Sequence, residues 1–210
     1  MTKIAIFLII LVAALGICYF YYRQKSELKS KPLPVSTTKK VVMVIAWRGF
    51  RSEEYFEPKR ILEQAGVVVK TASVEKGIAK GTGIGSTKID LLIGEINPLD
   101  FDAVIFVGGP QALQYLDNQN SYRIIRETVK CGKILAAICI SPTILAKSGV
   151  LQGKKATVWY SAVNRQPIEI LKENGANFVD QDVVQDGNII TANGPGAAKK
   201  FGKAILEALR

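Results

Sequence analysis

The chain has 210 residues, of which 48% are hydrophobic and 22% charged, a composition that suits one α/β domain with an additional terminal segment. The net charge is +10, but residues 1–40 carry seven Lys or Arg and one acid, which leaves +4 for residues 41–210. A weakly basic domain without clustered arginines argues against nucleic-acid binding. Histidine is absent, which excludes histidine metal ligands, triads and proton shuttles, and three cysteines make no disulfide framework.

The first feature along the chain is an apolar segment, residues 4–22, which contains no charged residue. As a helix rising ~1.5 Å per residue, it matches the thickness of the hydrocarbon core of a bilayer. Aromatic residues at 19–22 and the following Arg23 resemble the flank of a membrane helix. A cleaved signal peptide is the alternative, but cleavage near residues 14–16 would leave a mature chain beginning ICYFYY, which is a poor start. We therefore predict an uncleaved, single-pass transmembrane anchor within residues 1–22.

Residues 23–40 are polar, basic and interrupted by prolines, and they predict a flexible linker that can lie against anionic lipid. The excess of basic residues after the span favours a cytoplasmic location for the domain at residues 41–210. Lys3, before the span, also suits the opposite orientation, so both sides of the membrane stay open.

The domain alternates short apolar runs with amphipathic runs. We predict strands at 41–46, 67–73, 103–109, 134–139 and 156–159, helices at 53–66, 121–132, 141–149 and 164–176, and β-hairpins within 77–96 and 182–192. Gly149 and Gly175 stand where helices should end. Alternating strands and helices predict a mainly parallel sheet covered on both faces, a flavodoxin-like or Rossmann-like three-layer sandwich.

The stretch GTGIGS at 81–86 invites a phosphate-loop or dinucleotide-binding interpretation. It lacks the Lys-Ser/Thr of a phosphate loop, and it does not lie between the first strand and its helix. We interpret it as a glycine-rich hairpin turn, and we expect neither a cofactor nor a metal ion.

Cys139 lies at the carboxyl end of a predicted strand, where α/β sheets bind ligands. The pattern Ala137-x-Cys139-x-Ser141 is that of a nucleophile elbow, in which small residues flank a strained turn. The N-terminus of the next helix would favour the thiolate. The alternative is a small buried cysteine that only fills space.

Two other strand ends could complete such a site. Gly108-Gly109-Pro110 can present a backbone N–H group to an oxyanion, together with the N–H of Ile140. Glu53 and Glu54, at the start of the first helix, could bring a carboxyl group to the same crevice, or could simply complement the helix dipole.

From about residue 41 to its end, the chain resembles the PfpI family, which includes the parkinsonism-associated deglycases and has the class I glutamine amidotransferase-like fold. The resemblance rests on the motifs EEYFEP, FVGGP, AAICISPTILAKSGVLQGKKATVW and VVQDGNIITANGPGAA. It implies that Cys139 is the nucleophile, that Glu54 hydrogen-bonds its sulfur, and that Gly109 and Ile140 form the oxyanion hole. It also implies a homodimer.

The chain departs from this family at its histidines. Protease-like members have a histidine after the cysteine, where this chain has Ile140, and deglycase-like members have one near the position of Tyr160. A peptidase is therefore not expected. We expect thiolate addition to a small electrophile such as a 2-oxoaldehyde, with Glu54 relaying a proton and Tyr160 as a candidate donor.

Two alternatives belong to other classes of function. In the first, peroxide oxidises Cys139 and the protein is a redox sensor or chaperone-like protein. In the second, the domain is a catalytically inactive binding scaffold, and Cys139 is inert.

Overall fold

The structure is a computed structural model that describes residues 38–210. The predicted membrane span and all but the last residues of the predicted linker lie outside the described residues. Within residues 38–210, no helix has the length and apolar character needed to cross a membrane.

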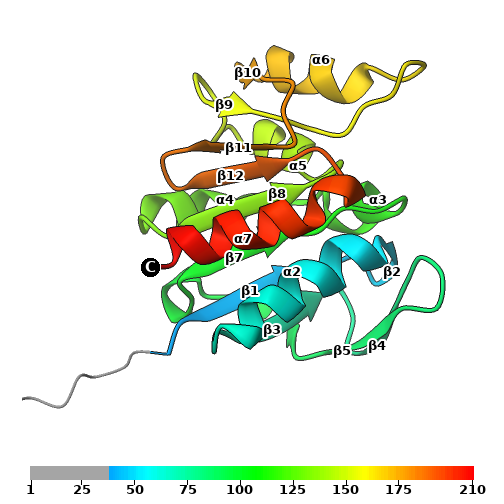
Figure 1. Cartoon of the computed structure of the whole chain (residues 1–210), viewed down its shortest axis with the longest axis vertical. Helices are drawn as coiled ribbons and strands as arrows, with labels where there is room; N and C mark the ends of the chain where they lie inside the picture. The colour runs from blue at the N-terminus through cyan, green and yellow to red at the C-terminus, as the bar shows by residue number, and fades with distance from the viewer. Residues whose placement is uncertain (1–37) are drawn as a thin grey trace, which may run out of the picture. The chain divides into compact units, whose positions relative to one another are not determined.

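A seven-stranded sheet forms the centre of the domain (Figure 1), with the strand order β11-β12-β8-β7-β1-β3-β6. Every neighbouring pair is parallel except β11 and β12, which form an antiparallel hairpin. The strands are β1 (Lys40–Val44), β3 (Val68–Ser73), β6 (Leu91–Leu92), β7 (Ala103–Phe106), β8 (Ile134–Ile138), β11 (Val183–Asp186) and β12 (Ile189–Ala192). The predicted mainly parallel sheet is confirmed.

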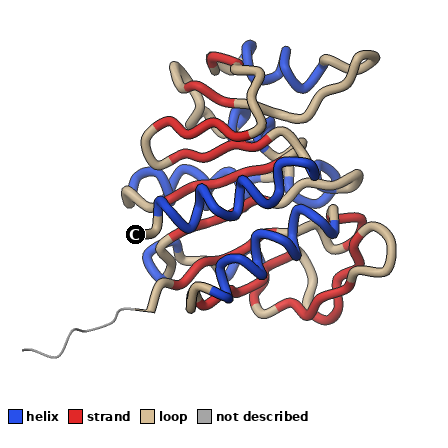
Figure 2. The backbone as a smooth tube through the Cα atoms, viewed as in Figure 1, coloured by secondary structure: helices blue, strands red, loops and turns tan. Residues whose placement is uncertain are grey.

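Helices cover both faces of this sheet, as Figures 1 and 2 show. They are α2 (Ser52–Gln64) and α7 (Ala198–Ala208) on one face, and α3 (Ala112–Leu116), α4 (Gln119–Lys130), α5 (Pro142–Lys147) and α6 (Gln166–Glu173) on the other side of the molecule. Side chains of β1 alternate between two cores: Val41 and Met43 join the core under α7, whereas Val42 and Val44 join the core under α4 and α5. Both cores are needed because a parallel sheet is buried on both faces.

Two small sheets flank the central one. In the first, β2 (Arg48–Phe50) pairs with β4 (Gly77–Gly81), which forms an antiparallel hairpin with β5 (Ser86–Ile89). The predicted hairpin is thus confirmed, and GTGIGS is its turn, with φ of 71° at Gly83. The second small sheet consists of β9 (Lys155–Ala156) and β10 (Asn177–Phe178).

The predicted strand at 156–159 is wrong in length and in sheet. Only its first residue belongs to β9, and β9 pairs with β10 instead of joining the central sheet. The reason lies in the backbone donors of the segment. The N–H of Thr157 donates to the side chain of Thr191 at 2.9 Å, and the N–H of Trp159 donates to the carbonyl of Cys139 at 2.9 Å. These bonds replace a strand ladder.

The C-terminal helix α7 was not among the predicted elements. Its buried residues Ala198, Phe201, Gly202 and Ile205 follow helical spacing, so the signal was present in the sequence. A Cβ atom on Gly202 would lie 2.8 Å from Cα of Pro58, so glycine at this position lets α7 approach α2 closely.

Candidate functional site

Cys139 lies between the end of β8 and the start of α5, in a backbone conformation that is rare for its residue type. Its φ is 64°, and it is the one non-glycine residue among 38–210 with a positive φ. The turn is held on both sides, because the Cys139 N–H donates to Ala192 O at 2.9 Å and its carbonyl accepts from Trp159. Such a strained conformation persists only where the surroundings impose it.

Ser141 also fixes this turn. It is fully buried, and its hydroxyl donates to the carbonyl of Val107 at 2.9 Å. This bond ties the start of α5 to the end of β7. Pro142 then begins the helix, at a position where its missing N–H has no helical acceptor to lose.

Glu54 enters the same region from the first turn of α2 and is fully buried. Within the described residues, neither of its carboxylate oxygens accepts a hydrogen bond of normal geometry. Gly108 lies between Glu54 and Cys139, since a Cβ atom added there would come within 2.6 Å of Glu54 Oε2 and would also collide with Cβ of Cys139. Glycine at 108 therefore lets carboxyl and thiol come together.

The carboxyl of Glu54 has an unusual affinity for protons. Burial raises its pKa from 4.5 to about 7, against smaller opposing effects of the Cys139 thiol, the Arg51 charge and the Gly108 N–H. Near neutral pH, Glu54 therefore exists in both protonation states. This is the property expected of a residue that accepts and returns a proton.

The Cys139 thiol does not have the low pKa predicted from the sequence. Cys139 is 8% exposed, and burial raises its pKa, followed by the charge of Glu54 and the hydrogen bond to it. The N–H groups of Ile140 and Gly109 act in the opposite direction without overcoming these effects. The prediction overlooked desolvation and the proximity of Glu54, and α5 is a helix of only six residues.

The N–H groups of Gly109 and Ile140 hydrogen-bond to the Cys139 thiol, and both lower its pKa. Neither donates to a backbone acceptor among residues 38–210. Gly109 has φ of 131°, and a Cβ there would lie 2.5 Å from the backbone nitrogen of Arg51 and 2.8 Å from the carbonyl carbon of Phe50. Only glycine fits this close approach between two loops.

Tyr160 lies apart from this group. Its hydroxyl donates to Asp180 at 2.8 Å, and its ring packs edge-on against Phe178 and beneath the guanidinium of Arg165. The bond to Asp180 raises the pKa of the Tyr160 hydroxyl. The contacts give no support to Tyr160 as a donor to a ligand at Cys139. The residue of this segment that contacts Cys139 is Trp159, through its backbone.

Arg51 is a residue of this region that the sequence did not single out. It is partly buried and immediately precedes α2, and its backbone N–H donates to Gly108 O at 3.0 Å. Its Nε is buried without a hydrogen-bond partner in the described part of the chain. Arginines are common on protein surfaces, so one that stands near a glutamate motif could not be recognised from the sequence as a residue of the site.

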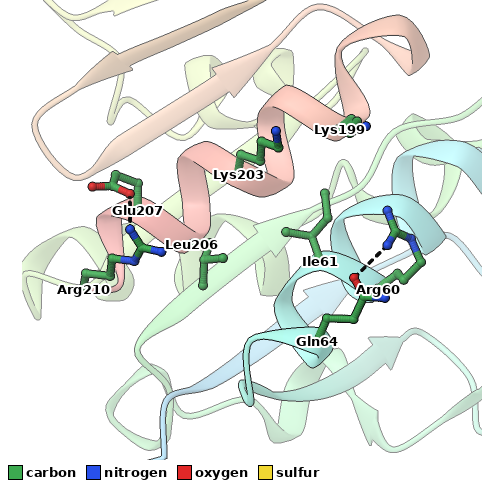
Figure 3. A pocket seen from close by; sticks show the side chains of 8 residues that line it. All are labelled: Arg60, Ile61, Gln64, Lys199, Lys203, Leu206, Glu207 and Arg210. Carbon is green, nitrogen blue, oxygen red and sulfur yellow. Dashed lines mark hydrogen bonds and ion pairs between the residues drawn. The ribbon is translucent and has the colours of Figure 1, made fainter.

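A groove of about 530 Å³ lies elsewhere, between α2 and α7 (Figure 3). Four basic side chains line it, together with Glu207 and three others, and two of the basic ones are already paired: Arg60 with Glu57 and Arg210 with Glu207. None of the residues around Cys139 lines this groove. Within residues 38–210, no three His, Cys, Asp or Glu side chains are placed to hold a metal ion.

Comparison with known proteins identifies relatives over the described domain. The DJ-1/PfpI family matches residues 39–208. An uncharacterized protein of Methanocaldococcus jannaschii is 37% identical over the whole chain and 98% of its own length. The deglycase PfpI of Pyrococcus furiosus is 34% identical over 169 residues, which are 80% of this chain and 99% of the deglycase.

Solved structures agree with this result. A ThiJ/PfpI domain protein from Brachyspira murdochii has a TM-score of 0.77 and 34% identity, covering 82% of this chain and 96% of its own. DJ-1beta of Drosophila melanogaster has a TM-score of 0.70 and 29% identity, covering 82% and 91%. The chain therefore belongs to the DJ-1/PfpI family and has its α/β fold.

Proposed function

We propose that the domain is a deglycase-like or glyoxalase-like enzyme, in which the Cys139 thiol adds to the carbonyl carbon of small electrophiles such as 2-oxoaldehydes. The observation that carries this proposal is Glu54, a fully buried carboxyl beside Cys139 with a pKa of about 7. A structural role would not require a buried carboxyl without a well-formed hydrogen bond, because such a group destabilises the fold. The names of relatives such as the Pyrococcus furiosus deglycase agree with this function.

The proposed addition needs no histidine. Glu54 as carboxylate takes the proton of the Cys139 thiol while the sulfur forms a bond to the aldehyde carbon and the carbonyl π bond opens. The resulting oxyanion accepts hydrogen bonds from Gly109 and Ile140, and protonated Glu54 then returns its proton to that oxygen. The raised pKa of the thiol means that attack and proton transfer are coupled, instead of starting from a standing thiolate.

With a 2-oxoaldehyde the reaction can continue without an external oxidant. The same carboxylate removes the hydrogen of the former aldehyde carbon as a proton, and reprotonation at the neighbouring carbon gives a 2-hydroxy thioester. One carbon is oxidised as its neighbour is reduced. Water then cleaves the thioester, which gives a 2-hydroxy acid and restores the thiol.

Turnover of methylglyoxal by purified protein tests this function. We expect loss of lactate formation in both Cys139→Ala and Glu54→Gln, with activity retained in Tyr160→Phe and in Glu53→Gln, an exposed neighbour of Glu54. Unimpaired lactate formation by Cys139→Ala would contradict the proposal.

The second candidate function is a peroxide-responsive switch. Cys139 retains 8% exposure, and a sulfenic or sulfinic oxygen on its sulfur could bond to protonated Glu54 and to the N–H groups of Gly109 and Ile140. Stoichiometric oxidation of Cys139 by low peroxide, without turnover of 2-oxoaldehydes, distinguishes this function. An inert Cys139 in both assays leaves a binding scaffold.

We further propose that residues 1–22 anchor the domain to a membrane, on the cytoplasmic side, and that the domain forms homodimers. The apolar run at 4–22 supports the anchor, and the Methanocaldococcus jannaschii relative aligns over these residues as well. Fractionation of cell membranes, with protease protection of the domain, tests anchoring and sidedness together.

A further inference from the structure

Arg51 is an arginine that the fold leaves without an acidic partner. The partly buried Arg123 pairs with Glu127, and the exposed Arg60 and Arg210 pair with acids one turn away. Three other arginines of the described residues also form no ion pair, but they are exposed: Arg48, Arg126 and Arg165. Among the described residues, Arg51 forms no ion pair and its side chain takes part in no hydrogen bond, although its Nε is buried. A guanidinium deprived of water at one nitrogen gains more than an exposed one from an anion that reaches it.

The backbone of Arg51 holds the residue against the loop that separates Glu54 from Cys139. Its N–H donates to Gly108 O, and its carbonyl accepts from the Tyr55 N–H at 3.2 Å. Gly108 itself is in contact with both Glu54 Oε2 and the Cys139 side chain, as the space for a Cβ atom at 108 shows. The charge of Arg51 lowers the pKa of the Glu54 carboxyl, so the guanidinium lies within electrostatic reach of this carboxyl.

Proton transfer to Glu54 changes the charge balance around Arg51. When Glu54 holds the proton taken from the thiol, the negative charge has moved to the oxyanion, and Arg51 forms no ion pair among the described residues. A carboxylate on the ligand would give this guanidinium a charged partner. A planar guanidinium fits a carboxylate well, because two N–H groups can meet two oxygens.

We propose that Arg51 makes the Cys139 site selective for small carbonyl electrophiles that carry a carboxylate, over uncharged electrophiles of the same size. This inference rests on the proposed function, since it requires Cys139 to be the reacting group. Arg51 is a binding residue in this scheme and takes no part in the proton transfers.

Alkylation of the full chain by iodoacetate and by iodoacetamide tests the proposal without any turnover. The two reagents have nearly the same size and the same reactive carbon, and they differ in one negative charge. Tryptic cleavage after Lys133 and Lys147 puts Cys139 on a different peptide from Cys131, so mass spectrometry reports its rate separately. The ratio of the two rates cancels effects on the thiol pKa, which act on both reagents alike.

We expect the ratio of iodoacetate to iodoacetamide rates to fall about threefold in Arg51→Met, the factor that one unit charge produces at ~7 Å in an aqueous medium. Arg51→Lys should restore part of the ratio, because it restores the charge without the two parallel N–H groups of the guanidinium. Arg48→Met, the matched control, removes an exposed arginine three residues away and should leave the ratio unchanged. The same ratio of rates, measured on urea-unfolded protein, gives the baseline for a solvent-exposed Cys139 thiol.

Three results would overturn the inference, and they are distinguishable. If Cys139 reacts with both reagents and Arg51→Met leaves the ratio unchanged, Arg51 does not select for charge, while the proposed function stands. If Arg51→Met and Arg48→Met lower the ratio equally, the effect comes from the general charge of the surface. If wild-type Cys139 reacts with neither reagent, the thiol is inert and the proposed function fails together with this inference.

Discussion

Replacing Glu54 by glutamine should make the domain more stable at alkaline pH while it abolishes the chemistry. Glutamine has the shape of the glutamate and no charge, so it removes the cost of an ionised carboxyl in a buried position. A gain in stability on losing a group is expected where that group serves a function.

The magnitude follows from the two pKa values. The folded protein holds the Glu54 proton up to a pKa of about 7, whereas the ordinary value is 4.5. Between these pH values the folded state binds more protons than the unfolded state, so the free energy of unfolding falls as pH rises. At ~1.4 kcal/mol per pH unit between 4.5 and about 7, the free energy of unfolding falls by about 3 kcal/mol in total, and the fall is complete above pH 7. In Glu54→Gln the free energy of unfolding does not fall in this way.

Urea unfolding of residues 36–210 at about pH 5 and pH 8 measures the effect. This fragment is a reasonable test object because the Pyrococcus furiosus deglycase aligns over 99% of its own length with the domain alone. We expect wild type and Glu54→Gln to agree within about 1 kcal/mol at pH 5, and Glu54→Gln to be more stable by about 2–3 kcal/mol at pH 8. The exposed Glu53→Gln should follow wild type at both pH values. Equal stability of wild type and Glu54→Gln at pH 8 would refute the reasoning.

Three further predictions concern the surroundings of the site. Gly108→Ala should destabilise the fold by about 1–3 kcal/mol and lower the alkylation rate of Cys139, because its Cβ would collide with Cys139 and Glu54. Thermal unfolding measures the loss of stability. Gly94→Ala, at a position with open space around it, is the control. Ser141→Ala should cost about 1–3 kcal/mol in urea unfolding, because Val107 O loses its donor in a buried position; no change would mean that another donor replaces the hydroxyl. Tyr160→Phe removes the bond to Asp180 and should leave the Cys139 alkylation rate unchanged; a slower rate would restore Tyr160 as a candidate for the site.

The regular part of the fold could be predicted because its signals are local. The apolar run of β8, the amphipathic run of α4 and the Gly149 helix end each follow from a few neighbouring residues, and the structure confirms them. The segment at 156–159 could not be placed, because the side chain of Thr191 and the carbonyl of Cys139 take its backbone donors. Both acceptors are distant in the sequence.

The candidate site shows the same division between local and distant information. The proximity of Glu54 and Cys139 could be expected from strand ends and from the family resemblance. The proton affinity of the pair could not, because it depends on how completely Gly108 and its neighbours exclude water from both groups. Arg51 could not be singled out from the sequence, because its proposed role depends on a buried guanidinium nitrogen that has no hydrogen-bond partner in the described residues.

The two edges of the central sheet bear on how copies of this domain could associate. At one edge β6 is only two residues long, and at the other β11 is accompanied by the β9–β10 ribbon, where the Lys155 N–H and the Lys154 side chain bond to Asp186. Short strands and charged groups at sheet edges discourage pairing with strands of another molecule. The central sheet therefore offers little template for growth into larger β-structures, and copies held close together would have to meet through their helices and loops.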